Sequence, residues 1–287
     1  MTRLLLRLAL SALLLSSLAL TPLRAETVAG TPNAVTATDL SRILQIPGII
    51  AVMRREGLEY GRSLEDEMFA GRGGDGWNAT VALVYDEPTM LRRFNAAFAA
   101  ALADDPGTMT AVAAWFDTPL GQRILTLEIE ARQALMDKAV EEAARVHADQ
   151  MTADGDPRMA ALRAFATAND LIEANVQGAL NANLGFYQGM SQAGAFGDDM
   201  TEDQMLSDVW AQEPDIRTET EDWLYPFLAL AYGPLSDADL AGYTAFSATP
   251  AGAKMNSALF AAFDAVFVQI SRDLGRAVAR QMTGDDI

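Results

Sequence analysis

One short pattern occurs twice in the sequence, as WFDTPLGQRI at 115–124 and as FSATPAGAKM at 246–255. Each copy has an aromatic residue three positions before a Thr-Pro-x-Gly step, and a cation two positions after the glycine. A threonine hydroxyl can cap a helix start, and proline fits the first helical position. Because the residue before a proline avoids the helical conformation, the preceding helix must end there. Each pattern therefore predicts a sharp corner between two helices.

The two predicted corners comprise Trp115, Thr118, Pro119, Gly121 and Arg123 in the first, and Phe246, Thr249, Pro250, Gly252 and Lys254 in the second. Glycine inside a helix costs about 0.5–1 kcal/mol relative to alanine, so its presence in both corners indicates a close neighbour. The upstream aromatic residue is the expected neighbour. A cation in a first turn opposes the helix dipole, so each cation is expected to pair with an acid or to face a ligand. We interpret the corners as structural; the alternative is a pocket at each corner that binds an anionic or extended partner.

The similarity of the chain to itself extends beyond the corners at the same shift of 131 positions. Residues 37–40 meet 168–171, and Asp105 meets Ser236, both of them helix-capping types. Agreement at one fixed shift predicts a tandem duplication with a pseudo-two-fold axis, although the middle of the copies matches poorly without gaps. The expected division is a signal peptide at 1–25, an extended segment at 26–36, helical repeat one at 37–150, a linker and helix lead-in at 151–167, helical repeat two at 168–282 and a tail at 283–287.

Apolar residues recur at spacings of three and four, which predicts an all-α protein of two similar helical-bundle halves. The longest stripes predict helices at 119–150 and 250–282. Each half is expected to hold about five helices, with the first helix of repeat one interrupted at Pro47. The best strand candidate, ATVALVY at 79–85, also reads as helix. Capping boxes are expected at three helix starts: Thr36 with Asp39, Thr201 with Gln204, and Ser236 with Asp239.

The N-terminal segment has the features of a secretory signal peptide. Arg3 and Arg7 precede an apolar run at 8–20, and Ala25 lies at a plausible cleavage point. The run is shorter than the roughly 18 apolar residues of a membrane span. We therefore expect cleavage after Ala25, a periplasmic or secreted location, and no stable membrane insertion afterwards. An uncleaved N-terminal anchor is the alternative, since Leu23 is not the small residue preferred three positions before a cut.

The chain is strongly acidic, with 21 Lys and Arg against 39 Asp and Glu and a formal net charge of −18. Three of the cations and none of the acids lie in 1–25, so the remainder has 18 cations and a net charge of −21. Such a protein repels phosphate backbones, so no nucleic-acid partner is expected. With 0 cysteines there is no disulfide, and stability must come from a large core.

Few residues suggest a reaction. His147 is the single histidine and there is no cysteine, so the sequence predicts no metal site, no cofactor and no catalytic triad. A carboxylate-based hydrolase needs only two carboxyl groups and stays a third hypothesis. The densest acidic clusters are interpreted as solvated surface: Glu65-Asp66-Glu67, and Asp198-Asp199 with Glu202-Asp203. Core packing is expected for the four tryptophans, Trp77, Trp115, Trp210 and Trp223; the alternative is a carbohydrate or peptide shelf, which requires them to be exposed together.

An aromatic residue, Ser/Thr-Pro-x-Gly and a cation at the head of a long helix resemble the exported bacterial family called domain of unknown function 2059. The second corner matches at Phe246, Thr249, Pro250, Gly252 and Lys254, and the first at Trp115, Phe116, Thr118, Pro119, Gly121 and Gln122. The resemblance implies a helical exported protein with two diverged copies of the unit, and it supplies no reaction. The leading hypothesis is a non-enzymatic periplasmic interaction or envelope-maintenance factor with an unknown protein or peptide partner. A small-ligand or peptide binder that uses the corner pockets is the alternative.

Overall fold

The computed structural model describes residues 35–69, 72–197 and 200–283, and every regular element in that part is a helix. The expected all-α class is therefore confirmed. The predicted signal peptide, most of the segment 26–36 and most of the tail 283–287 lie outside the described residues. The helices are α2 (Ala37–Ile43), α3 (Ile46–Phe69), α4 (Gly74–Val84), α5 (Glu87–Leu102), α6 (Pro106–Phe116), α7 (Pro119–Ala134), α8 (Lys138–Ala153), α9 (Pro157–Ala168), α10 (Leu171–Gln192), α11 (Glu202–Trp210), α12 (Glu213–Tyr232), α13 (Asp237–Ser247) and α14 (Pro250–Thr283).

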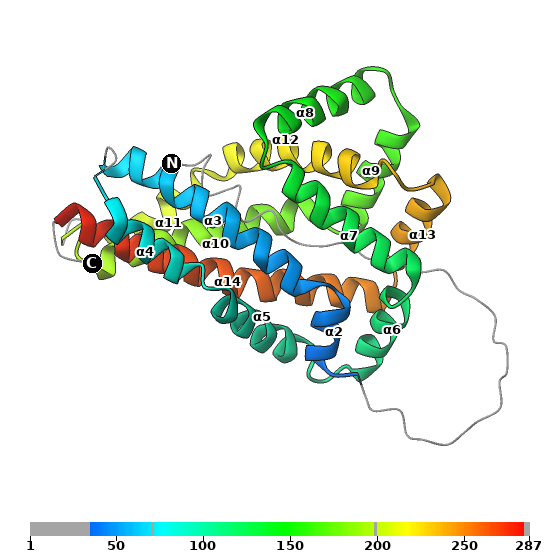
Figure 1. Cartoon of the computed structure of the whole chain (residues 1–287), viewed down its shortest axis with the longest axis horizontal. Coiled ribbons are helices and arrows are strands. Elements are labelled where there is room, and N and C mark those ends of the chain that lie inside the picture. Colours follow the sequence, from blue (N-terminus) through cyan, green and yellow to red (C-terminus); the bar gives the residue numbers. More distant parts are fainter. Residues whose placement is uncertain (1–34, 70–71, 198–199, 284–287) are drawn as a thin grey trace.

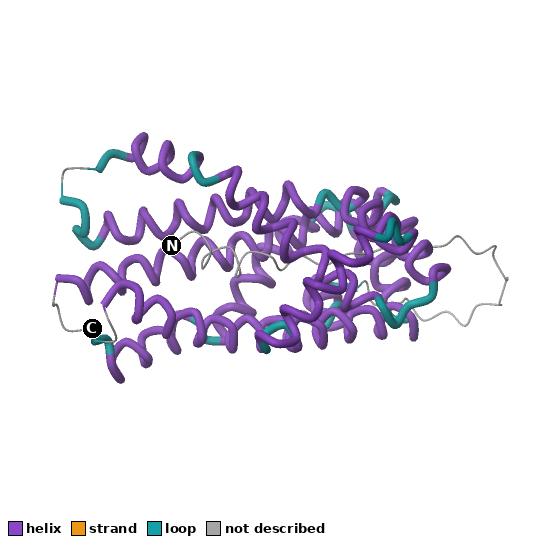
Figure 2. Tube along the Cα trace, turned by 90° about the horizontal axis from the view of Figure 1, so that it is seen from above, coloured by secondary structure: helices purple, strands orange, loops and turns teal. Residues whose placement is uncertain are grey.

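These helices form an elongated bundle, and most of them follow its long axis (Figure 2). The helix α14 runs along the bundle with α10 and α5 packed against it, while α8 lies on the outside over α12 (Figure 1). The short helices α4 and α11 lie at the end of the bundle where α14 ends, and α6 and α13 lie at the opposite end (Figure 1). The α6–α13 end therefore holds both predicted corners.

The contact between α10 and α14 is close because glycines on both helices face the partner's backbone. A Cβ at Gly189 would lie 2.1 Å from the carbonyl oxygen of Arg272, and a Cβ at Gly275 would lie 2.2 Å from that of Phe186. Any side chain at these positions would push the two helices apart. The helix α5 also packs against α14, and its two aromatic residues, Phe94 and Phe98, belong to the same continuous core, where the ring of Phe94 contacts that of Phe263 on α14.

Most helix starts agree with the capping chemistry of the sequence. All three expected capping boxes form, at Thr36, Thr201 and Ser236. Pro47 lies in the first turn of α3, and the chain breaks just before it at Gln45, whose φ is +54°. The strand candidate at 79–85 is helical, because it lies within α4 apart from its last residue.

One predicted helix is wrong, since the stretch expected as a single helix at 119–150 forms the two helices α7 and α8. The break falls at 135–137, where Asp137 caps α8 by accepting from the backbone N–H of Ala139. The change of direction lets α8 pack against α12 (Figure 1). The range 37–150 therefore holds more than the five helices expected, and the stretch 151–167 contains most of the helix α9.

Candidate functional site

Both Thr-Pro-x-Gly steps form the predicted helix corners. The hydroxyl of Thr118 accepts from the backbone N–H of Gly121 (3.1 Å) and donates to the carbonyl oxygen of Trp115 (2.6 Å). The hydroxyl of Thr249 makes the equivalent two hydrogen bonds at 3.0 and 2.7 Å. A single side chain thus caps the start of one helix and binds the end of the helix before it. This double contact fixes the angle of each corner.

The close neighbour of each corner glycine is the backbone of the preceding helix. A Cβ at Gly252 would lie 2.1 Å from the carbonyl oxygen of Phe246, and a Cβ at Gly121 would lie 2.7 Å from the Cα of Phe116. The expectation that an aromatic ring is the neighbour is wrong. Each corner is so tight that the end of the first helix touches the first turn of the second.

The aromatic residues of the two corners pack against each other. The indole of Trp115 stacks on Phe246, with ring centres 5.4 Å apart, and on Tyr243 at 5.5 Å. Phe246 is only 3% exposed, and Trp115 is half-buried. We call this stack of Trp115, Tyr243 and Phe246 the corner joint. Its rings fill the space between the two corners, so they connect the corners to each other.

The two corner cations interact with distant parts of the chain, Arg123 by a hydrogen bond and Lys254 through its charge. The guanidinium of Arg123 donates to the carbonyl oxygen of Pro234, in the turn between α12 and α13 (2.8 Å). Hydrogen bonds from Thr108, and then the charge of Lys254, lower the pKa of Asp105, the residue that caps α6. Lys254 therefore acts on an acid through its charge, whereas Arg123 binds a main-chain carbonyl.

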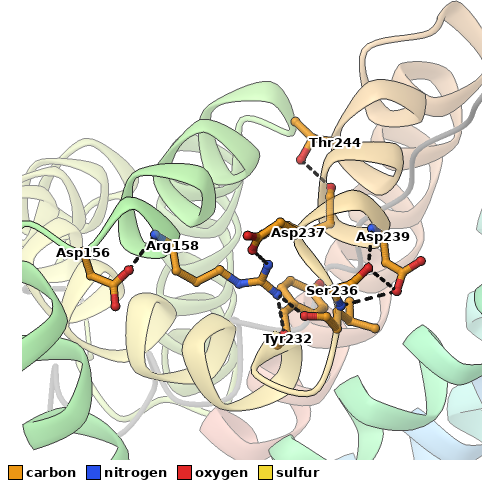
Figure 3. Close-up of polar contacts among 9 residues, drawn as sticks. Asp156, Arg158, Tyr232, Ser236, Asp237, Asp239 and Thr244 are labelled. Carbon is orange, nitrogen blue, oxygen red and sulfur yellow. Dashed lines mark hydrogen bonds and ion pairs between the residues drawn. The ribbon is translucent and has the colours of Figure 1, made fainter.

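Arg158, near the start of α9, was not singled out in the sequence, yet it binds the same turn (Figure 3). Its guanidinium donates to the carbonyl oxygens of Tyr232 (2.7 Å) and Leu235 (2.9 Å) and pairs with the carboxylate of Asp237 (2.6 Å). These carbonyls lie at and just after the end of α12, where the helix itself offers no donors. Arg158 and Arg123 together hold the turn that leads into α13.

Glu128 is a further residue not singled out in the sequence, although it lies on the apolar stripe of α7, four residues after Ile124. It is 3% exposed, and its Oε1 accepts from the hydroxyls of Tyr232 (2.7 Å) and Tyr243 (2.6 Å). Its Oε2 is buried and has no hydrogen-bond partner among the described residues. Burial raises the pKa of Glu128 to about 8, although the hydrogen bonds from Tyr243 and Tyr232 lower it. An acid on an apolar stripe is the signal that could have identified this residue.

Other candidates from the sequence lie apart from the corner joint. His147 is exposed on α8. Glu65 is buried and accepts from the backbone N–H of Gly74 (2.8 Å), so the solvated position expected for it is wrong, whereas Asp66 and Glu67 are exposed. Glu202 and Asp203 are exposed in the first turn of α11, while Asp198-Asp199 lies outside the described residues. Within the ranges that the structure describes, no cluster of His, Cys, Asp and Glu could hold a metal ion.

The tryptophans differ in their surroundings. Trp77 is fully buried, and its indole N–H donates to the carbonyl oxygen of Gly61 (2.8 Å). Trp223 is half-buried and stacks on Phe227, one turn along α12. Trp210 is 58% exposed, so the core position expected for it is wrong. Because Trp77 is buried, these side chains do not form one exposed aromatic shelf.

No helix in the described part of the chain has the length and apolar character needed to span a membrane. Comparison with known sequences and folds finds no curated protein and no solved structure that matches the chain. A family match does exist, and it runs from α5 through the first corner into α8 without reaching the second corner. Residues 88–150 match the family described as "Uncharacterized protein conserved in bacteria (DUF2059)", which is the family that the first corner resembles.

Proposed function

We propose that this chain is an exported, non-enzymatic protein that binds a protein or peptide partner in the bacterial envelope, as an interaction or envelope-maintenance factor. The observation that best supports this is the use of the corner side chains. Trp115 and Phe246 stack on each other, and Arg123 holds a turn of the backbone. These side chains build the scaffold, so a partner would be recognised by the outer surface. The matched family is itself uncharacterised, so it adds no reaction.

We further propose that the chain consists of two diverged copies of one unit, related by a pseudo-two-fold axis. The helices α6 and α13 have 11 residues each, and they start 131 positions apart. The starts of α7 and α14 are also 131 positions apart. The interactions of the two cations are also reciprocal. Arg123 binds the turn before α13, and the charge of the equivalent Lys254 lowers the pKa of Asp105, directly before α6. Packing about a two-fold axis produces such paired interactions.

The two alternatives have less support. A binding pocket at each corner needs accessible aromatic rings, whereas Phe246 is 3% exposed and is covered by Trp115. A glycosidase-like hydrolase places two carboxyl groups on either side of its substrate. Among the acids that the structure describes, Glu128 has the most strongly raised pKa, and it lies buried against two tyrosines rather than across a cleft from a second carboxyl group.

Partner recovery from a periplasmic extract, with the immobilised protein as bait, tests the proposal. Trp210→Ala removes an exposed tryptophan, and tryptophan is enriched at binding hot spots. Trp115→Ala removes a tryptophan of the corner joint instead. We expect Trp210→Ala to weaken recovery of a specific envelope protein and folded Trp115→Ala to leave it unchanged. Loss of recovery with Trp115→Ala alone would favour the corner pocket, and hydrolysis of cell-wall glycan by the wild type would favour the enzyme.

Export is tested separately by the mass of the protein isolated from the periplasm. A mature chain that begins at Glu26 is expected. A chain that keeps residues 1–25 and sediments with the membrane would support the uncleaved anchor instead.

A further inference from the structure

One buried carboxyl group connects three helices at the α6–α13 end of the bundle. Glu128 lies on α7, Tyr232 is the last residue of α12, and Tyr243 lies on α13. All three residues are at most 3% exposed, and both tyrosine hydroxyls donate to the same oxygen, Oε1, at 2.7 and 2.6 Å. The second oxygen, Oε2, is buried without a partner among the described residues. Glu128 is thus the one acid that both buried tyrosines share, while nearer the surface Arg123 of α7 binds the α12–α13 turn through the carbonyl oxygen of Pro234.

The cations and acids of the surrounding helices are engaged elsewhere or lie at the surface. Four arginines interact with other side chains. Arg163 lies over the ring of Tyr225, and the other three interact with acids: Arg132 with Glu56 of α3, Arg158 with Asp237, and Arg145 with Glu142, Asp149 and Asp222. Arg123 binds the carbonyl of Pro234, Asp239 belongs to its own capping box, and Glu130 is exposed. The helix α6 carries no ionisable side chain. A buried carboxylate without a cation is costly, so the neutral form of Glu128 is favoured.

We propose that Glu128, Tyr232 and Tyr243 form a proton-dependent latch, which holds α7 against α12 and α13 while the carboxyl is neutral and loosens when the carboxyl ionises. Oε1 accepts both hydroxyls, so the proton resides on Oε2. Burial raises the pKa of Glu128 from 4.5 to about 8, and burial also raises the pKa values of both tyrosines well above 10.0. Glu128 is therefore the member of the latch that titrates first.

The direction of the pH response follows from the raised pKa. The folded chain holds the proton of Glu128 more tightly than the unfolded chain, whose glutamate pKa is near 4.5. The stabilisation is complete below about pH 4.5, decreases as the pH rises, and is lost above the folded-state pKa of about 8. The latch is therefore closed in neutral or acidic surroundings and weak in alkaline ones. This response does not depend on the partner proposed above.

Denaturant unfolding between about pH 5 and pH 9 tests the latch, with purified wild type, Glu128→Gln and the control Glu142→Gln. The control removes an acid on α8 whose side chain is 61% exposed. The unfolding constant of the wild type, divided by that of Glu128→Gln, is expected to rise about tenfold per pH unit up to about pH 8. The corresponding ratio for Glu142→Gln is expected to stay constant. A ratio for Glu128→Gln that does not change with pH overturns the proposal.

Infrared titration of the wild type gives an independent measurement should Glu128→Gln fail to fold. The carbonyl stretch of a protonated carboxylic acid is expected at pH 7 and should disappear near the folded-state pKa of about 8. Tyr243→Phe should move this midpoint to higher pH, because the hydrogen bond from Tyr243 lowers the pKa. Absence of the band at pH 7, or a midpoint unchanged in Tyr243→Phe, overturns the proposal.

Discussion

The packing of the second corner can be tested by replacing Gly252 with alanine. The new Cβ would lie 2.1 Å from the carbonyl oxygen of Phe246 and 2.9 Å from the Cα of Ser247, whereas real Cβ atoms essentially never come within 3.0 Å of another heavy atom. Both contacted atoms belong to the main chain, so no side-chain rotation can relieve the clash and the corner has to open. Overpacking costs typically 1–3 kcal/mol, and occasionally more. We expect Gly252→Ala to lower the free energy of unfolding by about 3 kcal/mol.

Gly178 provides a matched control for the same substitution. It lies inside α10, and a Cβ there would meet no atom within 4 Å. Alanine at Gly178 is expected to raise the free energy of unfolding by about 0.5–1 kcal/mol, because it improves helix propensity and restricts the unfolded chain. Denaturant titration of both variants at one pH measures the difference. If Gly252→Ala is as stable as Gly178→Ala, the close backbone contact at the corner is refuted.

Two further predictions concern arginines that join distant helices. Arg158→Ala removes the donors to two carbonyls and should lower the free energy of unfolding, measured with denaturant, by about 2 kcal/mol. Asp237→Ala removes only a partner that is 97% exposed and should lower it by less than about 1 kcal/mol. Equal losses in the two variants would contradict this explanation. Arg132→Ala should cost about 3 kcal/mol, because it leaves the carboxylate of Glu56, only 18% exposed, without its partner. The double variant with Glu56→Ala should recover part of that loss, and a double variant no more stable than Arg132→Ala would contradict the interpretation.

Helix starts could be predicted from the sequence because their chemistry is local. Thr118 and Thr249 each bond to a backbone group three residues away, so the corner is encoded within one short stretch. The break between α7 and α8 is harder to predict in this way. The residues at 135–137 are Leu, Met and Asp, which include neither glycine nor proline, so the cap at Asp137 is the local signal of the break, and the break is accompanied by the packing of α8 on α12.

The candidate site was predictable only in part, for a similar reason. The corner residues were identified, but their partners were not, since Arg123 and Arg158 bind carbonyls 111 and 74 positions away. Every residue has a main-chain carbonyl, so the residue type at the acceptor position does not indicate such a contact. Glu128 did leave one, because a charged residue stands where the spacing of α7 requires an apolar one.

The close contact between α10 and α14 also has a consequence for how sequences of this kind can diverge. The atom that faces Gly189 is the main-chain oxygen of Arg272, which is present whatever residue occupies that position. A larger residue at Gly189 therefore cannot be compensated by a smaller one opposite. Trp115 and Phe246 meet through their side chains, so they can change together. In an alignment of relatives that span residues 115–275, we expect the glycines to be fixed and these two aromatic positions to covary; frequent alanine at Gly189 would contradict this.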